Sequence, residues 1–246
     1  MEYCKNCGLP VKDLYCDHCG QKANPDKINF SFLCREVFYF FTHLKRGFLF
    51  TSYQMVIRPG ETAKNFIDGR RKNYQSPISY FLIWTTLFIL FLYGMERVFG
   101  GNTVIRYRNY FGPAGATRLA ISNLSIVLMV IVPFQALYLF LLVTHRSYNY
   151  FETMVATIYS LGTIIQFQFV FAFFSMIYYL SMHKSVDLQI SDSLKILYLS
   201  WFITDTVRFY AVKHRGIRAI IFCILAFGTF TVWRLYGLPV FIRIFI

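Results

Sequence analysis

Long apolar stretches separated by short polar segments dominate residues 78–246. A bilayer core about 30 Å thick requires about 20 apolar residues in a helix. Stretches that reach this length are residues 78–99, 121–143, 154–180 and 217–236, and their charged residues occur only near their ends. The pattern therefore predicts an all-α membrane region with four spanning helices.

Residues 194–212 form a less apolar stretch that contains Lys195, Asp205 and Arg208. A charge near the bilayer centre costs at least about 2.5–3.5 kcal/mol on insertion scales. Asp205 and Arg208 have the spacing that places two side chains on one face of a helix, where they can form an intramembrane polar pair. We interpret this stretch as a fifth span, with an interfacial helix as the alternative.

Residues 23–77 alternate aromatic clusters with basic residues. In residues 30–44, apolar side chains recur at three- and four-residue spacing, which indicates an amphipathic helix at the membrane interface. We expect a second short helix that Thr51 caps and a third helix that Gly69 ends. These helices are too short to span a bilayer, so this segment is predicted to be juxtamembrane.

The composition and the charge support the same interpretation. The chain is 56% hydrophobic and 15% charged, against roughly 45–50% and 25% in soluble domains. These values exclude a disordered tail, a collagen-like repeat and a small disulfide scaffold, and they argue against a soluble cytosolic enzyme. The formal charge of +13 fits juxtamembrane lysines and arginines better than a nucleic-acid surface.

Basic residues are concentrated before the first predicted span, and they are Arg58, Lys64, Arg70, Arg71 and Lys72. Because lysine and arginine near spans favour the cytoplasmic side, we expect the N-terminus to lie in the cytoplasm, at the inner (plasma) membrane. A basic residue near an anionic leaflet contributes about 1 kcal/mol to membrane attachment. The five side chains are therefore candidate contacts for anionic lipid headgroups, with topology setting alone as the alternative.

Residues 1–22 contain two Cys-x-x-Cys pairs, whose members are Cys4, Cys7, Cys16 and Cys19. Each pair suits a tight turn that directs two sulfurs toward one point, and two such turns complete a tetrahedral zinc site. A glycine follows each pair, and we expect it to let the backbone fold beneath the metal. The pattern predicts a small zinc ribbon with four thiolate ligands.

Other uses of these cysteines are two disulfides or a redox-active pair. A cytoplasmic location disfavours disulfides, and two pairs in so short a segment disfavour a single redox couple. His18 could replace one ligand, although a solvated surface position is the simpler interpretation. So short a segment cannot form its own core, so metal binding supplies its folding free energy. Four thiolates leave no open coordination position, which makes the zinc structural.

Several short motifs occur together in residues 1–80, namely Cys-Gly-Gln at 19–21, Arg58-Pro59-Gly60, Gly69-Arg70-Arg71 and Pro77 before the first span. With the cysteine pairs, they resemble an uncharacterised bacterial membrane family that has an N-terminal zinc ribbon and is classed as a domain of unknown function. The resemblance covers essentially the whole chain. It implies the ribbon and a polytopic helical body, and it implies no activity.

Residues 147–162 are similar to the start of the third span of Yip-type membrane proteins. That family has a cytoplasmic N-terminal region and five spans. Its members are linked to trafficking and membrane organisation, without known catalysis. The similarity implies a five-span body with an organising role.

No motif of nucleophilic, metalloprotease or phosphate-loop chemistry occurs in the sequence. We therefore expect a non-enzymatic membrane protein that docks a cytoplasmic protein partner through its zinc ribbon and does not bind nucleic acid. The main alternative is a transporter or channel that uses the Asp205/Arg208 pair. A membrane-embedded enzyme acting on lipid is a third hypothesis.

Overall fold

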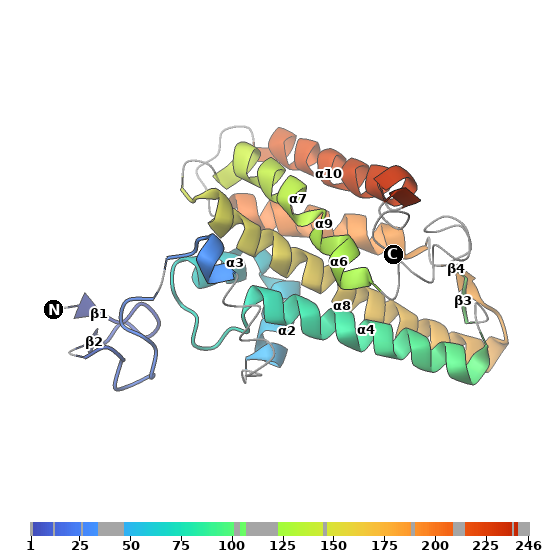
Figure 1. Ribbon diagram of the computed structural model, residues 1–246, viewed down its shortest axis with the longest axis horizontal. Coiled ribbons are helices and arrows are strands. Elements are labelled where there is room, and N and C mark those ends of the chain that lie inside the picture. The colour runs from blue at the N-terminus through green and yellow to red at the C-terminus, as the bar shows by residue number, and fades with distance from the viewer. Residues whose placement is uncertain are drawn as a thin grey trace.

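The computed structural model describes residues 2–11, 13–25, 27–33, 47–100, 104–106, 123–144, 147–187, 190–208, 215–237 and 239–240. The chain is mostly helical, and the head, which we define as residues 1–22, lies beyond one end of a bundle of long helices (Figure 1). The predicted all-α fold with a small cysteine-containing head is confirmed. The bundle thus has a head end and an opposite, far end.

Short strands lie at both ends of the molecule. In the head, β1 (Glu2–Tyr3) pairs antiparallel with β2 (Pro10–Val11). At the far end, β3 (Ile105–Arg106) pairs in parallel with β4 (Val186–Asp187). The bundle includes the helices α2 (Phe48–Ile57), α3 (Pro59–Ile67), α4 (Pro77–Phe99), α6 (Leu124–Met129), α7 (Val132–Leu139), α8 (Tyr150–Met182), α9 (Ile190–Arg208) and α10 (Arg215–Val232).

Among the described residues, the helical segments that are long and apolar enough to cross a membrane are Pro77–Phe99, Leu124–Thr144, Tyr150–Met182 and Gly216–Gly237. They coincide with the four long predicted spans. The second segment is interrupted between α6 and α7, and Pro133 lies in the first turn of α7. Proline lacks a backbone N–H, so it is tolerated in a first turn and disfavours a continuous helix through this point.

Helix α8 lies at the centre of the bundle and contacts α2, α3, α4, α7 and α9. Helix α4 approaches it closely at Gly162, where a Cβ atom would lie 2.6 Å from Tyr80 Cδ1. The Tyr80 hydroxyl forms a 3.0 Å hydrogen bond with Thr163 Oγ1 and donates to Gln166 Oε1 at 2.9 Å. Small and polar side chains therefore join these two helices, as is usual between helices in lipid.

Helix α9 carries the chain from the far end back to the head end (Figure 1). Its 19 residues extend over about 28 Å, nearly the thickness of a bilayer core. Its charged side chains lie near its two ends, where Lys195 pairs with Asp192 at 2.6 Å and Asp205 contacts α3. Helix α9 is not among the described helices that are long and apolar enough to cross a membrane, so the fifth span at 194–212 stays a prediction.

Helix α10 runs antiparallel to α6 and α7. Near the head end, Arg218 Nη1 donates to Leu142 O at 2.7 Å, and toward the far end Trp233 Nε1 donates to Val127 O at 3.1 Å. Successive long segments of the bundle therefore alternate in direction. Within the described residues, the chain passes between the two ends five times.

Helix α2 begins at Phe48 rather than at the predicted cap, Thr51. The Thr51 hydroxyl donates to Gly47 O and accepts from the backbone N–H of Gln75, both at 2.8 Å. The hydroxyl therefore connects α2 to the segment before α4 instead of capping a helix, and the prediction of a Thr51 cap was wrong. Most of the predicted amphipathic helix at 30–44 lies outside the described residues.

We predict that the two termini lie on opposite sides of the membrane, because five alternating passes exchange sides an odd number of times. A reporter enzyme that is active only outside the cytoplasm should be active when fused after residue 246 and inactive when fused before residue 1. Activity of neither fusion or of both would place the termini on one side and would mean that α9 does not cross the bilayer.

Candidate metal centre

The two Cys-x-x-Cys turns have the same backbone geometry. The N–H of Gly8 donates to Cys4 O at 2.8 Å, and the N–H of Gly20 donates to Cys16 O at 2.7 Å. Both glycines have positive φ angles, 76° and 66°, which residues with a Cβ rarely adopt. This explains why a glycine follows each pair in the sequence.

A second hydrogen bond closes each turn. The N–H of Cys4 donates to Leu9 O and the N–H of Cys16 donates to Gln21 O, both at 2.8 Å. Each cysteine pair therefore lies in a short loop whose ends are joined by the backbone. The second of these loops leads directly into Gln21.

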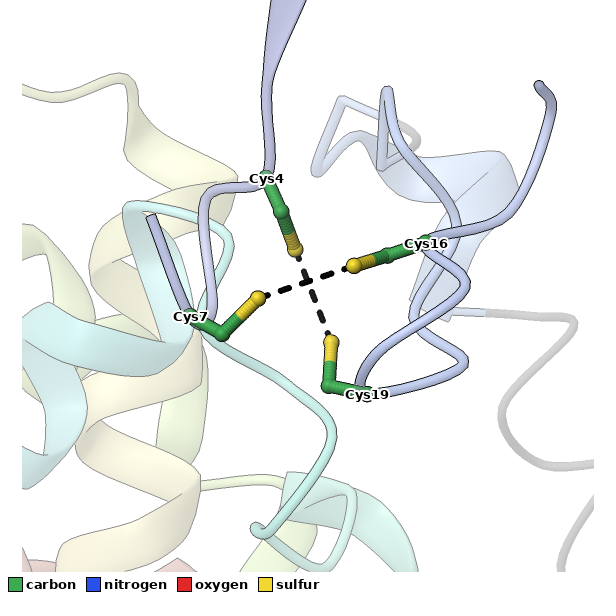
Figure 2. Close-up of side chains that lie close together, drawn as sticks. All are labelled: Cys4, Cys7, Cys16 and Cys19. Atoms are coloured by element: carbon green, nitrogen blue, oxygen red, sulfur yellow. Dashed lines mark hydrogen bonds between the residues drawn. The ribbon is translucent and has the colours of Figure 1, made fainter. Parts of the chain in front are cut away.

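The four cysteine sulfurs converge on one point from the two loops (Figure 2). Cys4 Sγ lies 3.6 Å from Cys19 Sγ, and Cys7 Sγ lies 3.6 Å from Cys16 Sγ. A tetrahedral site with metal–sulfur bonds of about 2.3 Å has sulfur–sulfur edges of about 3.8 Å, whereas a disulfide bond is about 2.05 Å long. The arrangement fits one metal ion and does not fit disulfides.

Burial and crowding of the thiols also favour a cation. Burial raises the pKa of the Cys4 thiol, but hydrogen bonds from the backbone N–H groups of Cys7 and Asn6, together with those from the Cys19 and Cys7 thiols, outweigh it and lower the pKa to about 7. The N–H of Leu9 lowers the pKa of the Cys7 thiol, but loss of solvent and the Cys16 thiol raise it to about 12. Without a cation, one thiolate therefore forms more readily than several, and a bound metal would remove this restriction.

Within the described part of the chain, these cysteines are the one group of three or more potential ligands whose ligand atoms converge, and all lie within 4.8 Å of one another. His18 is exposed and does not belong to the group. The predicted set of Cys4, Cys7, Cys16 and Cys19 thus comes together and could hold a metal ion.

Gln21 attaches the head to the loop between α3 and α4, a contact that we did not predict from the sequence. Its side chain is only 6% exposed. Its Nε2 donates to Gly69 O at 2.6 Å, and its Oε1 accepts from the N–H groups of Arg71 and Lys72, both at 3.0 Å. A single amide side chain thus binds three backbone groups of the loop, which we define as residues 69–72 and call the basic loop.

Two features of the contact between Gln21 and the basic loop require a glycine at position 69. Its φ angle is 102°, a conformation that glycine adopts readily. A Cβ atom on Gly69 would also lie 2.9 Å from Pro25 Cγ and 3.0 Å from Lys5 Cδ. The head and the segment after it therefore lie directly against this glycine.

The basic residues predicted to contact lipid lie around α3 and in the basic loop. Arg58 pairs with Glu61 at 3.4 Å, and Lys64 pairs with Asp68 at 2.5 Å. Lys72 is exposed, and its Nζ would lie 3.3 Å from a Cβ on Gly20 in the head. Exposed ion pairs contribute about 0–1 kcal/mol, so these contacts leave the predicted lipid binding open.

Arg70 and Arg71 differ in their surroundings although they are neighbours in the sequence. Arg70 is exposed and donates to Asn65 Oδ1 at 3.4 Å. The Arg71 guanidinium carbon lies 4.9 Å from the ring centre of Phe32 and 5.3 Å from that of Phe66, and Arg71 Nε donates to Phe66 O at 3.1 Å. Arg71 therefore packs within the protein, through cation–π contacts.

Asp205 makes its closest polar contact with α3 rather than with Arg208. Its Oδ2 accepts a hydrogen bond from the N–H of Gly60 at 2.8 Å, in the first turn of α3, whereas Arg208 Nη1 lies 3.9 Å from its Oδ1. The Arg208 side chain is 61% exposed. Unsatisfied N–H groups and the helix dipole make the start of a helix favourable for a carboxylate. The structure therefore assigns Asp205 to the attachment of α3.

Gly60 allows this attachment. A Cβ atom at this position would lie 2.5 Å from Thr206 N and 2.6 Å from Thr206 Cα. The backbones of α3 and α9 are therefore in direct contact there. The Pro59-Gly60 motif combines a proline suited to the first turn of a helix with a glycine that no larger residue could replace without displacing α9.

We predict that the purified chain contains about one metal ion, because the four sulfurs form one tetrahedral set. Cys7→Ser should lower the metal content to well below one ion per chain in elemental analysis. Cys223→Ser is the matched control, since Cys223 lies in α10 and outside the cluster. Equal metal content in both variants would exclude this site.

We predict that Asp205→Asn lowers the free energy of unfolding by about 1–2 kcal/mol, because it removes a buried charged acceptor from the first turn of α3. Arg208→Gln should change it by less than about 0.5 kcal/mol, because that pair is long and exposed. Thermal unfolding in detergent measures both. A larger effect for Arg208→Gln would mean that the ion pair, not the helix start, stabilises Asp205.

A family described as a protein of unknown function (DUF3667) matches residues 46–89. The matched segment contains α2, α3, the basic loop and the first half of α4, which includes the surfaces bound by Gln21 and Asp205. No curated protein and no solved structure matches the chain. The comparisons are consistent with an uncharacterised family, and the similarity to Yip-type proteins stays a prediction.

Proposed function

We propose that the chain is a multi-pass protein of the bacterial inner membrane whose zinc-bearing head docks a cytoplasmic protein partner, without catalysis. The observation that carries this proposal is the closed set of four cysteine sulfurs in a head that lies beyond the end of the helical bundle. A metal bound by four thiolates has no open position for water or substrate. The role of the metal is then structural: it stabilises the folded head, whose surface contacts the partner.

Zinc is the metal that this site suits best. A tetrahedral set of thiolates is typical of zinc or of an iron–sulfur centre. The sulfur–sulfur separations of 3.6 Å match the edges of a tetrahedron around one ion and support a single structural ion. We therefore propose a structural Zn²⁺ at Cys4, Cys7, Cys16 and Cys19.

The head carries large apolar side chains that are exposed. Its exposed large apolar side chains are Tyr3 (65% exposed), Leu9 (42%), Leu14 (76%) and Tyr15 (59%). Exposed aromatic and aliphatic side chains on a small rigid unit are suited to a protein interface. Because Gln21 binds the basic loop, these other side chains form the surface that we assign to the partner.

The position of the basic residues supports a cytoplasmic head. Arg58, Arg70 and Lys72 are exposed around α3 and the basic loop, at the head end of the bundle. The positive-inside rule places such clusters in the cytoplasm, where the leaflet is anionic. We propose that these side chains contact lipid headgroups while the head extends from the membrane.

The transport hypothesis depended on Asp205 and Arg208 as a polar pair within the membrane. The hydrogen bond of Asp205 to Gly60 and the exposure of Arg208 give both residues another explanation. The hydrogen bond from the Gly60 N–H thus accounts for the buried Asp205 carboxylate without a transport path. Flux through liposomes that is lost in a folded Asp205→Asn variant would support transport instead.

We predict that a photo-crosslinking amino acid at Leu14 in intact cells forms a discrete adduct with a cytoplasmic protein. The same amino acid at Asp17, which is exposed and polar, should give little or none of this adduct. Combining Leu14 labelling with Cys4→Ser and Cys7→Ser should abolish it, because the head cannot fold without metal. An adduct that survives the loss of both cysteines would contradict docking by the metal-bound head.

A further inference from the structure

A short, continuous path of contacts connects the cysteine cluster with the basic loop. The N–H of Cys16 donates to the carbonyl of Gln21 at 2.8 Å, which fixes the backbone of Gln21 relative to a metal ligand. The Gln21 side chain then bonds Gly69, Arg71 and Lys72. The position of the basic loop is therefore coupled to the fold of the second cysteine turn.

Glutamine suits this contact because its amide both donates and accepts. Its Nε2 donates to one carbonyl while its Oε1 accepts from two N–H groups. A glutamate would place a second oxygen beside Gly69 O, and an alanine would leave three backbone groups without these partners. A buried backbone group that loses its partner is destabilising, so the closed loop depends on this one side chain.

The basic loop also holds cationic groups against the protein. Arg71 is packed between Phe32 and Phe66, and Lys72 Nζ lies close to Gly20 in the head. A metal ion of charge +2 with four thiolates has a net charge of −2, which attracts the cations of this loop. Removal of the ion takes away the ordered turn that faces the basic loop. It also removes the metal site whose negative charge attracts the cations of the loop.

We propose that the metal-bound head is a latch, in which Gln21 holds the basic loop closed and metal loss releases it. Metal supplies the free energy that folds the head, so the chain from Cys16 to Gln21 loses its fixed position when the metal leaves. The three hydrogen bonds to the basic loop are lost with it. Opening gives the loop backbone and the packed Arg71 guanidinium access to solvent and lipid, so the metal content of the head controls the juxtamembrane surface.

Trypsin tests the latch directly, because it cleaves after Arg70, Arg71 and Lys72. The full chain in nanodiscs of neutral lipid is digested briefly, and mass spectrometry identifies cleavage within residues 70–73. The metal-loaded chain should be protected there, and chelation should accelerate cleavage. Loss of three hydrogen bonds, one buried and two partly buried, corresponds to an increase of at least roughly tenfold in the open population that trypsin samples.

Variants separate the latch from general unfolding of the head. Gln21→Ala should retain its metal by elemental analysis, yet its basic loop should be cleaved as rapidly as in the chelated wild type. Gln21→Glu should behave similarly, because its carboxylate cannot donate to Gly69 O. Asn24→Ala is the matched control, since Asn24 lies just after the head and is exposed, and the basic loop should stay protected in this variant.

Three results would overturn the latch. One is continued protection of the basic loop in metal-loaded Gln21→Ala. Another is protection that persists in the wild type after the metal has been removed. The third is loss of metal from Gln21→Ala, which would place Gln21 in the folding of the metal site instead of in the control of the loop.

Discussion

Four cysteine sulfurs directed at one point are the constraint on which the N-terminal part of this molecule depends. The head is too short to bury a core of its own, and its two turns are alike because each must deliver two thiols to the same site. A metal there would fix both turns, and the second turn holds the backbone of Gln21. The position of the basic loop then follows from the three hydrogen bonds of that side chain.

Helix α3 and the basic loop form a platform between the head and the bundle. Gln21 holds the loop from one side, and Asp205 holds the start of α3 from the other. In both contacts a buried side chain forms hydrogen bonds with backbone groups at an end of α3, in its first turn or in the loop that follows it. The platform therefore connects the head to α9 and leads into α4. The matched family segment, residues 46–89, includes this platform.

The sequence was sufficient for features that depend on neighbouring residues. Long apolar runs located the spans, and the two Cys-x-x-Cys pairs identified the candidate metal ligands, because both patterns are local. Gln21 and Asp205 were different, since their partners lie 48 and 145 residues away. The i,i+3 spacing favoured Arg208 as the partner of Asp205. The backbone N–H at the start of α3 was overlooked as a partner because it carries no formal charge. Gly60 and Gly69 were the available signal for these two contacts, because a glycine can mark a place where another part of the chain comes close to the backbone. The sequence alone does not say which part of the chain that is.

The central claim is that one metal ion, bound by four thiolates, organises the head and, through Gln21, the basic loop. X-ray absorption at the zinc edge of the full-length chain in its membrane tests this most directly. The account predicts four sulfur neighbours at about 2.3 Å and no lighter ligand. Nitrogen or oxygen neighbours at about 2.0 Å, or a metal-free head with its cysteines joined as disulfides, would contradict it.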